Sequence, residues 1–201
     1  MNNKIIKLDN CIISSDGTTL IDIDDDVTEL ILPYNITKIF NLHSARKKLK
    51  TLVCPNVTEI CSGAFNKQFN LEYISLPKCI KIGGYAFNNC VNLKSIFIPN
   101  VEIIEYGTFS DCYELEFIDI PNLQAIKTSA FYNCKNLKYI NTANVITLHP
   151  FSIDNCDNLT YINGLLSNED IIGAFGDNIE QYQAYEQRNR DYKLKQLINK
   201  V

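Results

Sequence analysis

The sequence predicts a repeat solenoid, in which short coils of the chain stack on one another and share one elongated core. The same order of apolar, polar and small residues returns every 22 residues without a gap, and a period in this range is typical of solenoid repeats. Alternating apolar residues followed by proline form one part of each unit, which is the pattern of a short strand. One unit cannot bury its apolar side chains alone, whereas stacked neighbours can.

The repeated units occupy the middle of the chain. The unit that begins at Leu71 reads LEYISLPKCIKIGGYAFNNCVN, and the next two read LKSIFIPNVEIIEYGTFSDCYE and LEFIDIPNLQAIKTSAFYNCKN. Clear copies also begin at Leu49 and Leu137, a degenerate copy begins at Val27, and a truncated copy begins at Leu159. We therefore expect three segments, which are residues 1–26 as an N-terminal cap, 27–164 as the repeats and 165–201 as a C-terminal segment.

The motif L-x-x-I-x-I-P, then V-x-x-I, then A-F-x-x-C, resembles the BspA-like class of leucine-rich repeats. The resemblance covers about residues 27–164 and implies a right-handed leucine-rich-repeat coil with a parallel β-sheet on one face. Three departures lie toward the two ends. Gln68 replaces the cysteine, Ala143 replaces the proline and Ile153 replaces the phenylalanine, so less regular edges are expected.

Columns of like residues are expected to fill the core. The fourth and sixth positions of the strand motif turn inward, because side chains alternate along a strand. The proline that follows has no N–H group and ends the strand. Small residues precede the phenylalanine of each unit and allow close packing, so an aromatic spine is predicted along Phe65, Phe87, Phe109 and Phe131.

The second position of the motif alternates in charge along Lys50, Glu72, Lys94, Glu116 and Lys138. In an in-register parallel stack these residues lie one strand apart, so alternation replaces repulsion by attraction. Exposed ion pairs contribute little free energy, and fixing the register is therefore the expected role. Recognition of a zwitterionic partner is the alternative.

The third and fifth positions of the motif should point away from the core, and several are aromatic. Exposed aromatic patches often mark interaction surfaces, and tyrosine is common at binding hot spots. Aromatic residues also suit strands and stack along a ladder, so a structural role is the alternative. The candidate partner-binding face consists of Tyr73, Phe97, Phe117, Asp119, Tyr139, Asn141, Tyr161 and Asn163.

Half of the eight cysteines recur in one slot of the unit, namely Cys90, Cys112, Cys134 and Cys156. A residue that repeats with the fold serves the fold, and buried cysteine acts as a small apolar side chain. We expect buried thiols, because the parallel Cβ vectors of stacked coils suit a disulfide poorly. Cys11 and Cys61 are the least constrained by the pattern and are the candidates for reactive thiols.

No constellation of residues predicts catalysis. A zinc site needs convergent ligands such as paired C-x-x-C, and nothing in the sequence pairs His43 or His149 with a nucleophile. The run Asp22–Asp26 begins like a calcium loop but lacks its glycine at position six and its glutamate at position twelve, so a solvated turn is preferred. Gly83–Gly84 lacks the other glycines of a phosphate loop. We expect no enzyme activity, no cofactor and no metal.

Both ends are expected to cover the open core. Residues 11–23 read as a β-hairpin around Ser15–Gly17. After Gly164, two helices are predicted, because Ser167 with Asp170 and Asp177 with Glu180 resemble capping boxes. The second helix, residues 178–200, carries an apolar stripe of Ile179, Tyr182, Leu194, Leu197 and Ile198. It either caps the last repeat or docks a partner, including a second copy of the chain.

Composition limits the partners. A net charge of −4 argues against nucleic acid, and the lack of an 18-residue apolar run argues against a membrane span. The first residues lack the apolar stretch of a signal peptide, which predicts an intracellular, cytoplasmic location. We expect an interaction module that binds a protein or peptide on the candidate face. The alternative is a structural or assembly protein that associates through its ends or its C-terminal helix.

Overall fold

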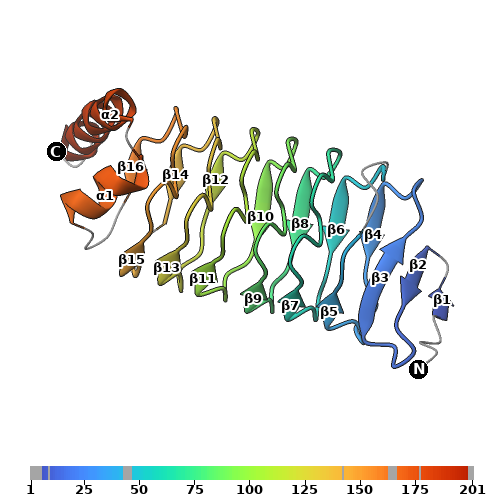
Figure 1. The fold of residues 1–201 in the computed structure, drawn as a ribbon. Coiled ribbons are helices and arrows are strands. Elements are labelled where there is room, and N and C mark those ends of the chain that lie inside the picture. The colour runs from blue at the N-terminus through green and yellow to red at the C-terminus, as the bar shows by residue number, and fades with distance from the viewer. Residues whose placement is uncertain are drawn as a thin grey trace.

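The computed structural model describes residues 6–8, 10–42, 47–141, 143–162, 167–176 and 178–198. It shows an elongated solenoid in which the strands of successive coils stack side by side, with the two termini at opposite ends (Figure 1). The predicted repeat solenoid is confirmed. The buried apolar residues of all coils form one continuous cluster, as expected when each coil is covered only by its neighbours.

The predicted strands form a first ladder along one side of the solenoid. Neighbours pair in parallel with the same register, so that Tyr73 lies opposite Thr51 and Ser95. The central residues of β6 and β8, Leu52 and Ile74, point inward and are buried. The strands of this ladder are β4 (Glu29–Ile31), β6 (Thr51–Val53), β8 (Tyr73–Ser75), β10 (Ser95–Phe97), β12 (Phe117–Ile118), β14 (Tyr139–Ile140) and β16 (Tyr161–Ile162).

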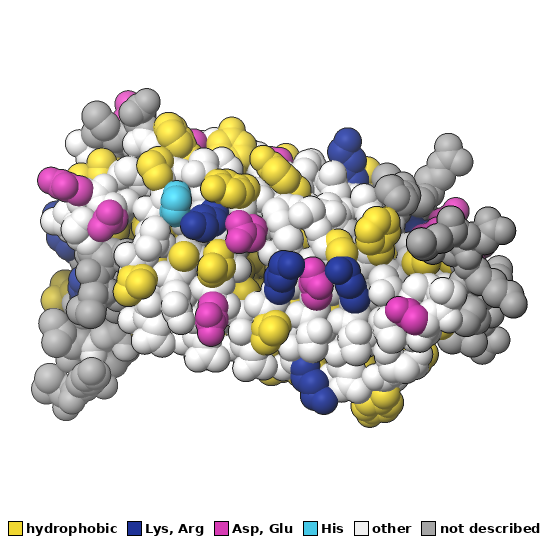
Figure 2. Space-filling model, turned by 60° about the horizontal axis from the view of Figure 1, so that its bottom comes forward, with side chains coloured by type: hydrophobic (Ala, Val, Ile, Leu, Met, Phe, Trp, Pro, Cys, Tyr) yellow, Lys and Arg dark blue, Asp and Glu magenta, His cyan; other side chains and the backbone are white. Residues whose placement is uncertain are grey.

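A second parallel ladder, which the sequence analysis did not include, follows the V-x-x-I part of the motif. Its strands are only two residues long, too short to show alternation in the sequence. They are β5 (Lys38–Ile39), β7 (Glu59–Ile60), β9 (Lys81–Ile82), β11 (Ile103–Ile104), β13 (Ala125–Ile126) and β15 (Thr147–Leu148). Figure 2 views this side, where hydrophobic side chains are interspersed with basic and acidic ones.

Both ladders are interrupted near the middle of the molecule. In the described part of the chain, β10 does not pair with β12, and β9 does not pair with β11. The third side of the coils bridges both gaps with main-chain hydrogen bonds. Across the gap between β9 and β11, Phe87 N–H donates to Thr108 C=O at 2.9 Å, and across the gap between β10 and β12, Phe109 N–H donates to Ala130 C=O at 2.8 Å. The coils therefore stay stacked where strand pairing lapses.

The aromatic spine lies along this third side and is confirmed. The rings of Phe65 and Phe87 are stacked with centroids 5.0 Å apart, and the next two spacings, to Phe109 and Phe131, are each 5.4 Å. The ring spacing is close to the separation of paired strands, so one aromatic ring per coil fills the core without a gap.

The N-terminal hairpin is confirmed and contains one more strand than expected. The strands β2 (Cys11–Ile13) and β3 (Thr19–Ile23) pair antiparallel, and β1 (Ile6–Leu8) adds to β2. The turn is closed by Asp16, whose carboxylate accepts hydrogen bonds from Thr18 N–H at 3.0 Å and Thr18 Oγ1 at 2.9 Å. Because β3 pairs in parallel with β5, the hairpin extends the second ladder.

Two helices follow the last strand, α1 (Asn168–Ala174) and α2 (Ile179–Ile198). The capping box of Ser167 and Asp170 is confirmed. The second box cannot be compared, since Asp177 lies outside the described residues. The main chain of α1 takes the place of a further coil, because Phe151 N–H donates to Gly173 C=O at 3.0 Å and Ile153 N–H donates to Ala174 C=O at 3.1 Å.

Gly83 marks a close approach of two coils. A Cβ atom at this position would lie 2.5 Å from the main-chain nitrogen of Ser62, which is far inside van der Waals contact. Gly83 is therefore required by packing, in agreement with the interpretation of the glycine pair as a structural element.

We predict that Gly83→Ala destabilises the protein by about 1–3 kcal/mol, the usual range for overpacking a tight site. Gly173→Ala is the matched control, because a Cβ there would meet nothing within 4 Å and alanine favours a helix. Urea unfolding of both variants measures the difference. Equal stability of the two variants would show that the coils can move apart at Gly83.

Candidate interaction surface

The candidate partner-binding face lies on the first ladder and falls into two groups. Tyr73 and Phe97 belong to β8 and β10, on the N-terminal side of the break, and their side chains are exposed. Phe117 and Tyr139 lie opposite each other on β12 and β14, beyond the break. Phe117 is 55% exposed, whereas Tyr139 is half-buried. The aromatic residues thus belong to two separate sheets.

The polar members of the face flank the second group. Asn141 Nδ2 donates a hydrogen bond to Asp119 Oδ1 at 2.8 Å, so these two side chains of adjacent coils are tied together. Tyr161 lies opposite Tyr139 in the ladder, but the structure describes only its main chain. Asn163 lies outside the described residues.

A groove opens where the second group meets helix α2. It has a volume of about 400 Å³ and is lined by Phe117, Lys138, Tyr139, Thr160 and Tyr192. Lys138 Nζ lies 5.4 Å from the centroid of the Phe117 ring and 2.6 Å from Glu116 Oε2. The groove therefore has aromatic walls and a lysine whose charge is already paired.

Tyr192 is the functional candidate that the sequence analysis missed. The predicted stripe on α2 did not include it. The available signal was its spacing of seven residues from Tyr185, which places both tyrosines on nearly the same face of a helix. Tyr185 is buried, with its ring 5.2 Å from that of Phe175.

The first half of α2 is anchored by hydrogen bonds that replace those of a further coil. Gln181 Oε1 accepts from Asn155 N–H at 2.9 Å, where the equivalent Asn133 N–H donates to the main-chain carbonyl of Asp154. Arg188 Nε donates to the carbonyl of Leu159 at 2.9 Å. This half of α2 acts as a cap, in agreement with the first of the two expected roles.

The second half of α2, from Arg190 to Gln196, is exposed. Within the predicted stripe, Tyr182 is half-buried and Leu194 is 58% exposed. The side chains of Ile179, Leu197 and Ile198 are not described. The helix therefore covers the last coil with one end and projects the other.

The alternating charge column forms ion pairs on both sides of the break. Glu72 lies between Lys94, at 2.7 Å, and Lys50, at 3.4 Å, and hydrogen bonds from Lys94 and then Lys50 lower the pKa of Glu72. Among the described ion pairs, none joins Lys94 to Glu116, which lie on either side of the break between β10 and β12. Charge pairing thus follows strand pairing, as a role in register requires.

Asparagine columns, which the sequence analysis did not use, tie each coil to the one before. Asn100 Nδ2 donates to the carbonyl of Pro77 at 2.7 Å, and Asn122 Nδ2 donates to that of Pro99 at 3.1 Å. The signal was present as asparagine directly after the strand-ending proline in successive units. These bonds satisfy main-chain carbonyls at the corners of the coil.

The four repeated cysteines are buried and each donates a hydrogen bond to the carbonyl of the spine phenylalanine 25 residues earlier. For Cys90 and Phe65 the Sγ–O distance is 3.1 Å. Burial raises the pKa of Cys90 to about 12 and that of Cys112 and Cys134 well above the ordinary thiol value. These thiols are therefore poor nucleophiles at neutral pH.

The expectation of a reactive thiol is wrong for Cys11, because β2 turns its side chain into the core, where it is only 5% exposed. Cys61 is partly exposed, and its reactivity stays a prediction.

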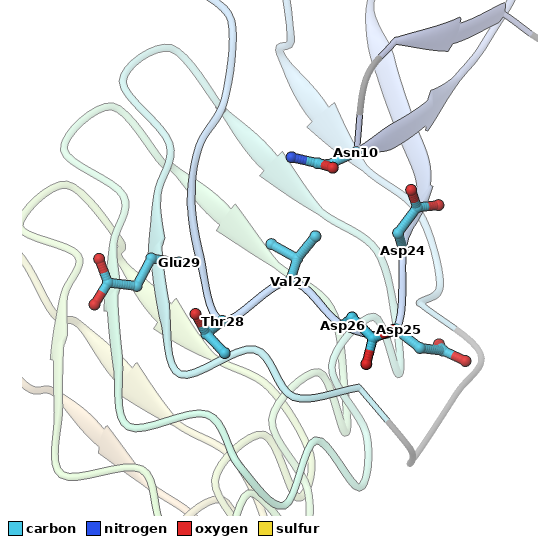
Figure 3. A pocket seen from close by; sticks show the side chains of 7 residues that line it. All are labelled: Asn10, Asp24, Asp25, Asp26, Val27, Thr28 and Glu29. Atoms are coloured by element: carbon cyan, nitrogen blue, oxygen red, sulfur yellow. The ribbon is translucent and has the colours of Figure 1, made fainter.

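The acidic run before the repeats forms a surface hollow with Asn10 (Figure 3). The carboxylates of Asp24, Asp25 and Glu29 point in different directions in this view. Lys47 is buried and lies 2.8 Å from Asp22 and 3.1 Å from Asp25. Burial lowers the pKa of Lys47, but the hydrogen bonds with the two carboxylates outweigh it, and the net direction is upward.

The described residues contain no cluster of three or more histidine, cysteine or acidic side chains arranged to hold a metal ion. His149 Nε2 lies 3.4 Å from Lys127 Nζ, and His43 lies outside the described residues. None of the described helices combines the length and the apolar character that a membrane crossing needs.

The repeat geometry agrees with a comparison of the sequence with known families. The BspA type leucine-rich repeat region matches in six copies, over residues 23–138 and 58–175. The chain belongs to this family. A search of curated protein sequences gave no significant match.

Solved structures of bacterial leucine-rich repeat proteins share the fold of this BspA-type chain. A T. pallidum leucine-rich repeat protein has a TM-score of 0.66 at 20% identity, covering 79% of this chain and 77% of that protein. One from Eubacterium ventriosum has a TM-score of 0.65 at 21% identity, covering 83% and 53%. A leucine-rich cell surface protein from Faecalibacterium prausnitzii has a TM-score of 0.58 at 20% identity, covering 82% and 55%. This chain spans about half the length of the last two.

We predict that the free energy of unfolding falls above about pH 9, by up to about 1.4 kcal/mol per pH unit for each buried thiol. The thiol pKa is higher in the folded chain than in the unfolded one, so the stability is present at lower pH and is lost as the pH rises toward the folded value. In Cys112→Ala the free energy of unfolding should fall less steeply with pH, because the contribution of one buried thiol is removed. Urea unfolding from pH 8 to 11 measures this slope. An unchanged slope would mean that Cys112 ionises in the folded protein.

We also predict different results from two truncations of α2. Removing residues 178–201 deletes Gln181, Tyr185 and Arg188 and uncovers the last coil, so aggregation is expected. Removing residues 190–201 spares these contacts and should leave the unfolding midpoint nearly unchanged. Light scattering and urea unfolding measure both. A monomeric, equally stable protein after the longer truncation would contradict the capping role.

Proposed function

We propose that this protein is a non-enzymatic interaction module and that it binds a protein or peptide at the groove formed by Phe117, Lys138, Tyr139, Thr160 and Tyr192. Leucine-rich repeat proteins commonly mediate protein–protein interaction. The observation that carries the choice of surface is that helix α2 adds an aromatic wall beside the aromatic rungs of the first ladder. Fold alone does not choose a surface.

The groove suits an apolar side chain from an exposed loop or extended peptide of the partner. Its volume of about 400 Å³ is within the range of sites that enclose small groups. Rings supply a large apolar contact area with few rotatable bonds, which is why tyrosine is frequent at binding hot spots. The bonded pair of Asp119 and Asn141 offers polar groups at the neighbouring positions of the same face.

We also infer that the protein has no catalytic activity. The repeated thiols, which are the nucleophilic groups that recur with the unit, are buried and protonated at neutral pH. We keep an intracellular location as a proposal. The Faecalibacterium protein of similar fold is described as a cell surface protein, so fractionation of the native host is the direct measurement of location.

A second candidate function is assembly through the exposed half of α2. It is favoured by Leu194, which is 58% exposed on a helix that already touches the core with its other end. Light scattering over a range of concentrations measures this association, and Leu194→Ser should reduce it.

We predict that the double variant Phe117→Ser, Tyr139→Ser loses its partner while its circular dichroism spectrum stays the same, because Phe117 is exposed and the inward residues of both strands are unchanged. Affinity capture from the native host, quantified against wild type, measures the loss. Phe40→Ser is the matched control and should capture normally. The side chain of Phe40 is 48% exposed and directly follows β5, in the second ladder and away from the groove.

Equal recovery of the same proteins by wild type and by the double variant would place the interaction elsewhere. If the circular dichroism spectrum of the double variant differs from that of wild type, the loss of the partner would be a folding effect. Capture by the single variant Phe117→Ser would then decide whether the groove binds the partner.

A further inference from the structure

The N-terminal cap closes only one of the two ladders. Strand β3 of the hairpin pairs with β5 and so continues the second ladder. The first ladder ends at β4, and no strand in the described part of the chain pairs with its outer edge. Figure 1 shows β4 at the N-terminal end of its row, with the hairpin strands beyond it continuing the other row.

The outer edge of β4 carries main-chain groups that are bonded in every interior strand. Leu32 N–H donates to Val53 C=O at 2.9 Å, and Thr28 C=O accepts from Thr51 N–H at 3.1 Å, so Thr28 and Leu32 face β6. Alternate residues of a strand direct their N–H and C=O groups to opposite sides. Glu29 and Ile31 therefore direct their N–H and C=O groups outward. The equivalent residues of β6, Thr51 and Val53, direct the same groups to β4 and are bonded to it.

The side chains at this edge are incompletely covered. Leu30 is only half-buried, whereas the equivalent residue of the next strand, Leu52, is fully buried. Ile31 is 70% exposed and Tyr34 is 75% exposed. An additional strand beside β4 would bury Leu30 as β4 buries Leu52. Strand addition of this kind combines main-chain hydrogen bonds with burial of alternate side chains.

The surroundings of the edge decide the charge of the occupant. A hollow of about 590 Å³ runs from Asn10 and Asp24 to Thr28 and Glu29, and Val27 points into it (Figure 3). Its lining contains four carboxylates, Asp24, Asp25, Asp26 and Glu29. One lysine serves two carboxylates here, since Lys47 Nζ lies 2.8 Å from Asp22 Oδ1 and 3.1 Å from Asp25 Oδ1, while Lys48 Nζ lies 2.7 Å from Asp26 Oδ1. The carboxylates of these ion pairs thus outnumber the lysines, and Glu29 adds a further negative charge on the strand itself, which favours a basic occupant.

We propose that the outer edge of β4 binds an extended basic segment of another protein, which adds to the first ladder as a strand. Its apolar side chains cover Leu30, and its lysine or arginine side chains lie beside Glu29 and the aspartates. A second copy of this chain is the poorer occupant. Edge-to-edge pairing of two β4 strands would bring their carboxylates together, and like charges facing each other repel.

The exposed half of α2 carries Arg190, Lys193 and Lys195. It does not compete for this edge, because the N–H and C=O groups of a helix are already bonded to each other. The proposal is independent of the groove between the first ladder and α2, which lies at the opposite end of the solenoid.

The test uses the full chain and a capped seven-residue peptide of alternating lysine and valine. Residue-resolved hydrogen exchange by NMR should show fast exchange at the amides of Glu29 and Ile31 in the protein alone. Addition of the peptide should slow both by about tenfold or more, because each gains a hydrogen bond. The amides of Leu30 and Leu32 face β6 and should change little. A peptide of alternating glutamate and valine is the charge control and should protect neither edge amide.

Three variants separate the causes of binding. Ile31→Pro removes an outward N–H group and no bond to β6, so the lysine–valine peptide should bind about tenfold more weakly or worse. Ile31→Ala keeps the N–H group, so its affinity for the lysine–valine peptide should fall less than that of Ile31→Pro. Glu29→Lys should weaken the lysine–valine peptide and improve the glutamate–valine peptide. The Phe117→Ser, Tyr139→Ser variant should bind like wild type, so failure here and failure of the groove are distinguishable.

Equal affinity of Ile31→Pro and wild type would overturn the proposal. So would protection of Glu29 and Ile31 that grows with protein concentration without any peptide, because the occupant would then be a second copy. A circular dichroism spectrum of Ile31→Pro that matches wild type establishes that the ladder itself is intact. If that spectrum differs, the affinities of Glu29→Lys for the lysine–valine and glutamate–valine peptides decide the proposal. Unchanged affinities for both peptides would then overturn it.

Discussion

The stacking of each coil on identical positions of its neighbours is the constraint on which the rest of the structure depends. A coil of 22 residues has no interior of its own, so every inward side chain is covered from above and below by its counterparts. The two ladders, the phenylalanine spine and the thiols bonded to spine carbonyls all follow from one register. A shift of one residue would turn every inward strand residue to solvent, which is why so many independent columns specify the same alignment.

The ends of such a stack are the places where the constraint cannot be met by repetition. At the C-terminal end the helices reproduce the missing bonds with other groups, since the Gln181 side chain stands where a main-chain carbonyl would be. At the N-terminal end the hairpin reproduces the second ladder, and no strand among the described residues covers the edge of β4. Unpaired strand edges invite further pairing, and natural proteins often protect them with charge. The carboxylates around β4 oppose pairing with a second copy and still permit a basic strand.

Positions that repeat serve the stack, whereas positions that vary are available for recognition. Cys90 and its counterparts repeat, and they are buried, hydrogen-bonded and weakly acidic. The outward positions vary from coil to coil, and two adjacent strands beyond the break between β10 and β12 carry aromatic residues opposite each other, Phe117 and Tyr139. Helix α2 then brings Tyr192 to the same place. The aromatic walls of the groove are thus residues that do not repeat with the stack, which is the physical basis for assigning it to a partner.

The sequence by itself determined the period, the inward columns and the spine, because each is a local pattern copied along the chain and sampled several times. It also determined the hairpin, because two short strands around one turn are a local signal that needs no distant segment. It also identified Phe117, Tyr139 and the other outward aromatics, since alternation along a strand sets the direction of a side chain. It did not place Tyr192 beside them, reveal the two-residue strands of the second ladder, or show that the hairpin covers only one ladder. The strands of the second ladder recur in every coil, but two residues are too few to show alternation, so only the pairing of the coils reveals them. The position of Tyr192 and the coverage by the hairpin depend on how α2 and the hairpin lie against the terminal coils. Each of these two features occurs once and arises from contacts between distant segments, so no repetition in the sequence records it and only the tertiary structure decides it.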